Sequence, residues 1–138
     1  MQMIIADANT EVVTALRLVL AEKEQYQIIG EARDAVNLFS LVTHNCPDVV
    51  ILDADLPGLI STRKSLGSNL SELVETMRLL CPSISLLAMS SWPDAEKICL
   101  QANVNAFVCK SDPPETLLRK LEGLIKPQPF KRGFFQIM

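Results

Sequence analysis

Five short, almost unbroken apolar runs divide this chain, and each is followed by a segment whose apolar residues recur at helical spacing. Strands that read as continuous apolar runs are typical of parallel sheets buried on both faces. Because parallel strands need right-handed crossovers, the helices between them cover both faces of the sheet. The pattern therefore predicts an α/β fold with five strands and five helices. The expected strands are Gln2 to Asp7, Gln27 to Glu31, Asp48 to Asp53, Ser83 to Met89 and Ala106 to Cys109.

Capping residues mark where the expected helices begin. Asn9 or Thr10 can cap the first helix and Asp34 the second, by accepting backbone N–H bonds, and Pro113 and Pro114 suit the first turn of the last helix. His44 is expected at a helix end. The residues expected to face inward are Val13, Leu16, Val19 and Leu20, then Ala35, Leu38, Phe39 and Val42, then Leu70, Leu73, Val74, Met77 and Leu80, then Ala95, Ile98, Cys99 and Ala102, and finally Leu117, Leu118, Leu121 and Leu124.

Two segments depart from the alternating pattern. Ile60 to Asn69 is polar and contains Gly67, so it is predicted to be a mobile loop before a helix that starts near Leu70. The tail, 126–138, holds two prolines, basic residues and three of the five phenylalanines. It is predicted to be a frayed terminus or a truncated linker, with docking on this domain or a partner as the alternative.

Composition restricts the class of protein. The 138 residues suffice for one domain with a core, and 49% hydrophobic with 21% charged residues fits a globular protein. The net charge of −3 argues against direct nucleic-acid binding. The apolar runs are too short to span a membrane, and the first residues lack a signal-peptide pattern. We therefore expect a cytoplasmic protein without a membrane segment.

The four cysteines are Cys46, Cys81, Cys99 and Cys109, and no two of them form a C-x-x-C pair. Free cysteine behaves as a small buried hydrophobe, and cytoplasmic thiols stay reduced. The expectation is four reduced, core-packing thiols rather than a disulfide or a zinc site.

Charged and hydroxyl side chains follow four of the expected strands. Asp7 and Asp53 each end an apolar run, Ser90 and Ser91 follow the fourth strand, and Lys110 follows the fifth. The carboxyl ends of parallel strands converge on one crevice. Carboxylates suit Mg²⁺, a lysine supplies a point charge for phosphate, and a serine hydroxyl can donate to a phosphoryl oxygen. The set indicates a site where a carboxylate accepts a phosphoryl group.

The ordered motifs that carry these residues resemble a response-regulator receiver domain of the NarL/LuxR-type branch. The motifs are Ile5-Ala6-Asp7, Pro47 to Asp53 with Pro57-Gly58, Met89-Ser90-Ser91 and Phe107-Val108-Cys109-Lys110. The resemblance covers roughly Met1 to Ile125, so it implies a receiver domain over 1–125 followed by the tail. It also implies a flavodoxin-like sheet in the order 2-1-3-4-5, and a signalling module rather than an enzyme.

The resemblance implies a role for each matched residue. Asp53 matches the phosphoacceptor, Asp7 an acidic metal-site residue, and Asp55 the position whose backbone carbonyl contacts Mg²⁺. Ser90 matches the hydroxyl residue that turns toward the phosphoryl group. Lys110 matches the phosphate-sensing lysine, and Phe107 the aromatic switch residue.

The resemblance also implies partners. A sensor histidine kinase would supply the phosphoryl group, and a homodimer would form through the face of helix four, strand five and helix five. The branch usually carries a helix-turn-helix DNA-binding output domain, which does not follow in this chain.

Several positions depart from the receiver pattern. Ala8 stands where the family usually has a second acid, so Mg²⁺ binding is expected to be weak. The loop from Leu59 to Asn69 is longer than usual, and Lys110-Ser111 replaces the usual Lys-Pro pair. The main alternative is therefore a pseudo-receiver, an interaction module that works without phosphorylation. A nucleotide or flavin binder is disfavoured because no glycine-rich loop follows the first strand, and a helix cap is the rival role for Asp7.

Overall fold

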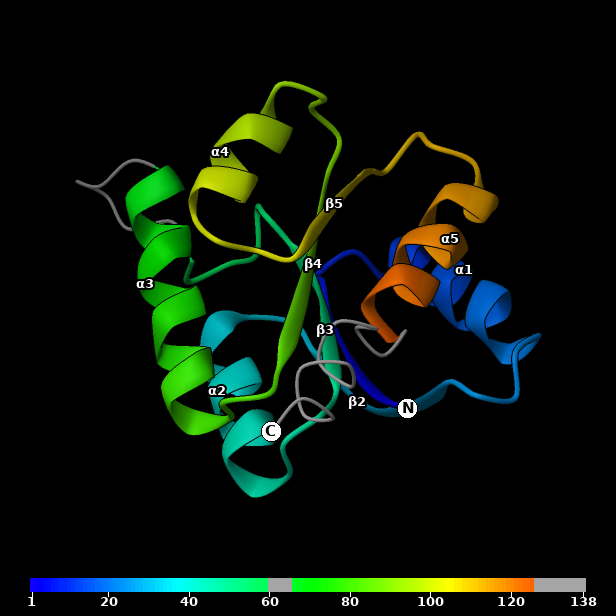
Figure 1. The fold of residues 1–138 in the computed structure, drawn as a ribbon, viewed down its shortest axis with the longest axis horizontal. Coiled ribbons are helices and arrows are strands. Elements are labelled where there is room, and N and C mark those ends of the chain that lie inside the picture. Colours follow the sequence, from blue (N-terminus) through cyan, green and yellow to red (C-terminus); the bar gives the residue numbers. More distant parts are fainter. Residues whose placement is uncertain (60–65, 126–138) are drawn as a thin grey trace, which may run out of the picture.

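The computed structural model describes residues 1–59 and 66–125, and it alternates strands with helices throughout (Figure 1). The five predicted β-α units are confirmed. No helix within these described residues is long and apolar enough to cross a membrane. The elements are β1 (Gln2–Ala6), α1 (Thr10–Ala21), β2 (Gln27–Ala32), α2 (Ala35–His44), β3 (Val49–Asp53), α3 (Leu66–Leu80), β4 (Ser85–Ser90), α4 (Ala95–Gln101), β5 (Ala106–Cys109) and α5 (Pro114–Ile125).

The five strands form one parallel sheet in the order β2-β1-β3-β4-β5, which confirms the predicted topology. Ala6 pairs with Leu52 on β3, and Asp53 pairs with Met89 on β4. Ser90 in turn pairs with Cys109 on β5. This register aligns the carboxyl ends of β1, β3, β4 and β5 along one edge, where Asp7 and Lys110 follow their strands directly.

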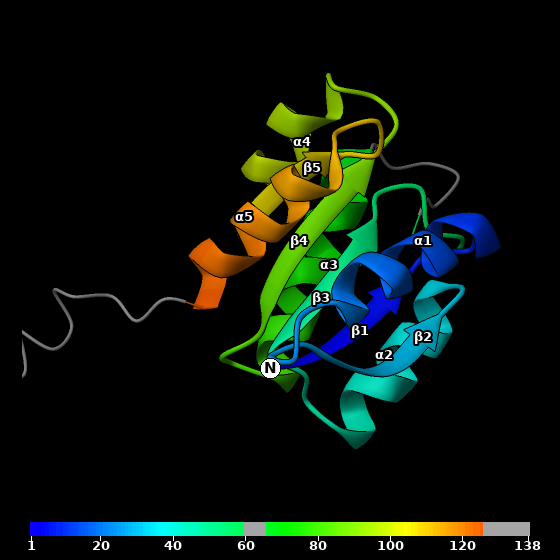
Figure 2. The same ribbon diagram turned by 90° about the vertical axis from the view of Figure 1, so that its right-hand side faces the viewer.

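Helices cover both faces of the sheet (Figure 2). Each face has its own apolar cluster. Helices α1 and α5 pack on one face through residues such as Leu16, Leu20 and Leu121. Helices α2, α3 and α4 pack on the other face. Burial on both sides explains why the strands read as continuous apolar runs, since β3 is buried throughout and β4 is buried from Leu86 to its end.

The predicted caps are largely confirmed. Asn9 caps α1 by accepting from the amides of Glu11 and Val12, and Asp34 caps α2 by accepting from Asn37. Helix α5 begins at Pro114, and His44 is the last residue of α2.

The prediction of a loop from Ile60 to Asn69 is wrong in its last part, because α3 begins at Leu66. Residues 60–65, like the tail 126–138, lie outside the described residues. Gly67 and Ser68 have low helix propensity, but they precede Leu70, Leu73 and Val74, which are buried. Burial of that apolar face outweighs local propensity.

Two of the residues expected to face inward do not. Leu80 is 42% exposed and Ile98 is 39% exposed. Leu80 is the last residue of α3, and Ile98 lies on α4, which has only seven residues. The apolar stripes extend past the part of each helix that the sheet covers.

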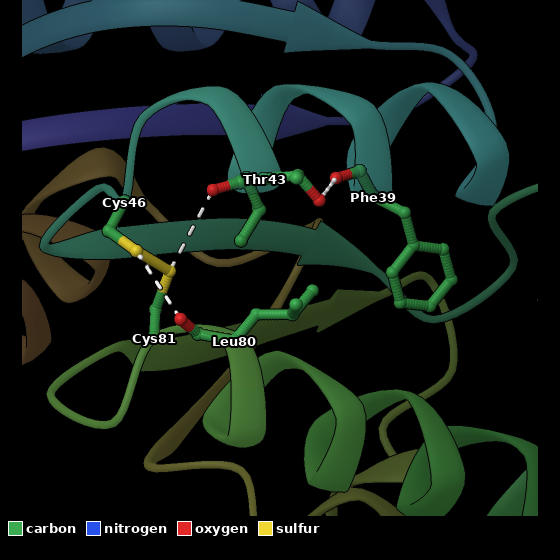
Figure 3. Close-up of a disulfide and its surroundings, with 6 residues drawn as sticks. Phe39, Thr43, Cys46, Leu80 and Cys81 are labelled. Atoms are coloured by element: carbon green, nitrogen blue, oxygen red, sulfur yellow. Dashed lines mark hydrogen bonds between the residues drawn. A yellow bond between two sulfur atoms is a disulfide. The ribbon is translucent and has the colours of Figure 1, made fainter.

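The expectation of four reduced thiols is wrong for two of them, because Cys46 and Cys81 form a disulfide (Figure 3). Cys46 lies on the exposed connection between α2 and β3, and Cys81 directly follows α3. They are 35 residues apart in sequence, and their Cα atoms are 5.7 Å apart, within the usual range for a disulfide. Cys99 and Cys109 are free and buried, as predicted.

The disulfide should contribute substantially to stability. In the chain-entropy model, a cross-link that closes a loop of this length stabilises the native state by about 3–4 kcal/mol. We expect Cys46→Ser to lower the free energy of unfolding by that amount in urea titrations without reductant. Reductant should lower the stability of the parent to the same level and leave Cys46→Ser unchanged. A parent that is insensitive to reductant would contradict this prediction.

Candidate functional site

The carboxyl edge of the sheet gathers three buried polar side chains. Asp7 is 3% exposed, Asp53 is 7% exposed and Ser90 is 1% exposed. They follow or end β1, β3 and β4, so the register described above places them side by side. Buried polar groups are costly unless they are paired. The rest of this edge must therefore supply their partners.

Lys110 joins the two carboxylates. Its Nζ lies 3.0 Å from Asp7 Oδ2 and 3.3 Å from Asp53 Oδ1. The lysine side chain is only 18% exposed, so these ion pairs are largely shielded from water. One ammonium therefore bridges two carboxylates that come from strands separated by more than 40 residues.

Backbone amides hold the two carboxylates in place. Asn9 N donates to Asp7 Oδ1 at 2.8 Å, and Asp55 N donates to Asp53 Oδ1 at 3.0 Å. Among the described residues, Asp53 Oδ2 receives neither a hydrogen bond nor an ion pair. That oxygen is the one available for a new bond.

The electrostatics of the site follow from its burial. Loss of solvent raises the pKa of Asp53, and the neighbouring charge of Asp7 raises it further, while the Asp55 amide and Lys110 act against both. Burial by itself would lower the pKa of Lys110, but the two carboxylates outweigh that effect and raise it. Lys110 therefore stays charged, and Asp53 is more basic than an ordinary carboxylate.

Ser90 and Lys110 are connected through the backbone. Lys110 N donates to Ser90 O at 2.8 Å, and Ser90 Oγ accepts from Trp92 N at 3.1 Å. Ser91 is exposed, so Ser90 is the serine of this pair that lies buried at the strand end. Phe107 is 4% exposed and packs in the cluster beneath α2, α3 and α4.

Asp112 shapes the turn that carries Lys110, a role that sequence reasoning missed. Asp112 Oδ2 accepts from Cys109 N at 3.0 Å, and Asp112 N donates to Cys109 O at 2.9 Å. The two bonds close a four-residue turn around Lys110. This turn stands where the receiver family usually has a Lys-Pro pair. The signal available in the sequence was an aspartate just before the prolines that open α5, a common place for side-chain-stabilised turns.

Gly58 allows the loop after Asp53 to approach α2 closely. Its φ is +85°, a conformation that favours glycine. A Cβ at this position would lie 3.3 Å from Ala35 Cβ. Ala35 N also donates to Pro57 O at 2.9 Å. The Pro57-Gly58 pair therefore fixes the path of the chain beside the acidic pocket.

The structure brings together Asp7, Asp53 and Lys110, as the strand ends predicted. Asn9 takes the helix-cap position, and Asp7 turns to Lys110 instead. Asp55 is exposed and touches Asp53 through its backbone amide. Within residues 1–59 and 66–125, no group of three or more His, Cys, Asp or Glu side chains could hold a metal ion. A metal at this edge would therefore depend on two carboxylates.

Comparison with known proteins gives a consistent result. The family model of the response regulator receiver domain matches residues 3–122. The oxygen regulatory protein NreC of Staphylococcus epidermidis is 28% identical over 124 residues, which cover 86% of this chain and 51% of NreC. The transcriptional regulatory protein YhcZ of Bacillus subtilis, itself uncharacterised, is 24% identical and is matched over 52% of its length. The chain spans about half the length of the curated relatives it matches.

Solved structures share the fold. RcsB from Salmonella enterica serovar Typhimurium, bound to promoter rprA in the presence of phosphomimetic BeF3−, matches with a TM-score of 0.75 and 24% identity over 91% of this chain and 99% of that chain. A LuxR-family response regulator from Aurantimonas sp. SI85-9A1 matches with a TM-score of 0.74 and 21% identity over 89% and 83% of the two chains. At these identities the likeness shows the fold alone.

Burial of the Asp53 carboxylate should cost stability in a pH-dependent way. A raised pKa means that the folded state binds the proton more tightly than the unfolded state. Stability should therefore fall as the pH rises from the ordinary carboxyl pKa through the raised one. We expect Asp53→Asn to match the stability of the parent at low pH and to exceed it above that interval, because the variant has no carboxylate to ionise in the buried site.

The free energies of unfolding of the parent and Asp53→Asn are compared by urea titration at a series of pH values, with EDTA present to remove metal ions. Asp55→Asn is the matched control, because Asp55 is exposed at the same loop and should show no such divergence. A parent that gains stability relative to Asp53→Asn as the pH rises would contradict the assigned direction.

Proposed function

This chain belongs to the response regulator receiver domain family, in its NarL/LuxR-type branch, and on that premise we propose that Asp53 accepts a phosphoryl group from a sensor histidine kinase. The observation that carries the proposal is the environment of Asp53. It is a buried carboxylate held against the ammonium of Lys110, and within the described part of the chain its Oδ2 oxygen accepts no hydrogen bond. The chain would then be a signalling module of the cytoplasm rather than an enzyme.

For phosphoryl transfer to Asp53, the protein has to position the reacting groups and neutralise their charge, and little more. Asp53 Oδ2 would attack the phosphorus of a phosphohistidine, the P–N bond would break, and the histidine nitrogen would keep that electron pair. The product is an acyl phosphate on Asp53. Phosphoryl transfer depends mainly on neutralising the transferring oxygens. Lys110 is already charged and within reach of the acceptor, which supports this role.

The donor set fits a weakly held Mg²⁺. Asp7 and Asp53 would bind it, with the backbone carbonyl of Asp55 as a further ligand. Two convergent carboxylates suit a hard cation that keeps several waters. When bound, the ion would supply positive charge to the phosphoryl oxygens. Ala8 removes the carboxylate that receivers usually add beside Asp7, so the affinity should be low.

The response would pass to the face formed by α4, β5 and α5. A phosphoryl group adds a charge of about −1.5 to −2, which would draw in Lys110 and the Ser90 hydroxyl. Phe107 would then repack, because it lies on β5, the strand that ends just before Lys110. Helix α4 has seven residues, and its cap residue Asp94 makes no side-chain cap bond. A helix this weakly anchored can shift between two packings.

We propose that this face forms a homodimer or releases an output region. Support comes from the relatives, of which the match covers about half the length, and from RcsB, whose structure is bound to a promoter. The proposed receiver domain covers 1–125, and the output would be a DNA-binding domain outside this chain.

A pseudo-receiver remains the second candidate, and Ala8 favours it. With one acid fewer, the carboxylates exceed Lys110 by a single charge instead of two, and Lys110 contacts both of them, so the resting pocket would depend less on a metal ion. Such a module would present the same surfaces but would not depend on phosphorylation.

Beryllofluoride, which mimics a phosphoryl group on a carboxylate, distinguishes a receiver that is phosphorylated on Asp53 from a pseudo-receiver. Trp92 is the only tryptophan in the sequence, it is 69% exposed, and its amide donates to Ser90 Oγ. If Ser90 turns toward the mimic, that hydrogen bond breaks and the tryptophan fluorescence changes. We expect a saturable change in the parent at millimolar Mg²⁺ and none in Asp53→Asn. Asp48→Asn, remote from this edge, is the control and should respond like the parent. No response in the parent would favour the pseudo-receiver.

The metal site can be tested by restoring the missing acid. Ala8 is exposed directly after Asp7, so Ala8→Asp has room for its carboxylate. We expect this substitution to tighten Mg²⁺ binding roughly tenfold or more, as one added charged ligand is worth about 1.4 kcal/mol or above. Isothermal titration calorimetry measures the dissociation constant for Mg²⁺, with Ala8→Asn as the uncharged control. Tight Mg²⁺ binding by the parent would overturn the expectation.

A further inference from the structure

We propose that Cys46–Cys81 is a site of reversible thiol–disulfide exchange, attacked at Cys46 by a dithiol reductant. It would be a second covalent input to this chain, separate from Asp53. The proposal rests on three observations around the disulfide (Figure 3). The two cysteines differ in exposure, each sulfur lies near a carbonyl oxygen that could accept from a thiol, and backbone hydrogen bonds hold the segments on both sides of the bridge.

Access decides which sulfur can be attacked. Cys46 is exposed on the connection between α2 and β3, whereas Cys81 is 3% exposed. Exchange requires the attacking thiolate to reach one sulfur directly. An incoming thiolate can approach Cys46 from solvent, and Cys81 is then the leaving group. Exposed disulfides are also the ones that tend to be labile.

A dithiol of the thioredoxin or dithiothreitol class supplies both electrons and both protons that the exchange requires. Its first thiolate forms a bond to Cys46 Sγ, and the Cys46–Cys81 bond breaks. Cys81 leaves as a thiolate and takes a proton. The second thiolate of the reductant then attacks the reductant's own sulfur in the mixed disulfide and releases Cys46. In total, two electrons and two protons pass to the protein, and the reductant becomes a disulfide.

The reduced thiols have acceptors in place. Cys46 Sγ lies 3.7 Å from Leu80 O, and Cys81 Sγ lies 3.8 Å from Val42 O, as the dashed lines in Figure 3 show. A disulfide sulfur carries no proton, but a thiol does. After reduction each S–H can therefore donate to a carbonyl that is already within reach. Neither thiol would be left buried without a partner.

The surrounding backbone does not rely on the disulfide. Asp48 N donates to Gln2 O at 2.8 Å, and Asp48 Oδ2 accepts from Gln2 N at 2.7 Å. Cys81 N donates to Met77 O, and Ile84 N donates to Cys81 O. Both segments stay attached to the sheet and to α3 when the sulfur bond opens. The reduced form should therefore keep the fold, at lower stability.

The location makes the site a separate input. The disulfide lies before β3 and β4, whereas Asp53 and Ser90 lie at the far ends of those strands. The loop that the bridge closes contains β3 and α3, so opening it removes a cross-link at the end of α3 without touching the acidic pocket. The proposed function places the domain in the cytoplasm, where disulfides are usually transient or redox-sensing. The cytoplasmic location rests on the proposed function. The exposure of Cys46 and the carbonyl oxygens near the two sulfurs do not.

Thiol counting tests the proposal on the whole chain. Native protein purified without reductant is equilibrated in stepped ratios of reduced and oxidised dithiothreitol, quenched in acid, unfolded and alkylated. Mass spectrometry should show two labels on the oxidised form, at Cys99 and Cys109, and four on the reduced form. We expect one reversible transition with unchanged far-ultraviolet circular dichroism. Four labels before any reductant, a need for denaturant, or loss of the fold on reduction would each overturn it.

The direction of attack is tested with a thioredoxin that lacks its resolving cysteine. It should be trapped as a mixed disulfide on the Cys46 peptide, with Cys81 free to be alkylated. Cys99→Ser is the matched control and should be trapped like the parent, while Cys46→Ser should not be trapped. Trapping on Cys81 would overturn the assignment. Neither experiment involves Asp53, so the outcome is independent of whether the chain is phosphorylated.

Discussion

The ammonium of Lys110 between the carboxylates of Asp7 and Asp53 is the interaction on which the acidic edge depends. Two buried carboxylates repel each other and have lost most of their water, so a neighbouring cation is needed to offset the cost of burying both charges. Lys110 can serve both only because β1, β3 and β5 end at the same level of one sheet. The turn closed by Asp112 and the bond to Ser90 O fix its backbone.

This charge balance also explains what the departure at Ala8 does. With Ala8 the pocket holds two carboxylates against Lys110, an excess of one negative charge. A third carboxylate would raise that excess to two, and the need for a cation at rest would be greater. An incoming phosphoryl group would add further negative charge, and Lys110 and Ser90 are the residues that could interact with it. The loss of one acid would weaken the proposed metal site and would at the same time lower the excess negative charge that the resting pocket has to carry.

The two ends of the sheet carry different chemistry. The carboxyl edge holds ionisable groups whose state depends on charge, and the amino edge holds the Cys46–Cys81 bridge, whose state depends on electrons. Helix α3 connects the two regions, since it ends at the bridge and packs against α4 and the cluster that contains Phe107. The two proposed covalent inputs would thus be separated by the length of the strands.

The α/β class, the carboxyl ends of the strands and the meeting of Asp7, Asp53 and Lys110 could all be predicted from the sequence, because apolar periodicity reports burial and parallel strands share one edge. Other features depend on contacts between segments that are distant in the chain. The pairing of Cys46 with Cys81 depends on α2 and α3 ending side by side, which 35 intervening residues conceal. The start of α3 at Leu66 and the exposure of Leu80 and Ile98 depend on how far the sheet covers each helix. Local pattern specifies which face is buried, but the extent of burial is set by neighbours that are distant in the chain.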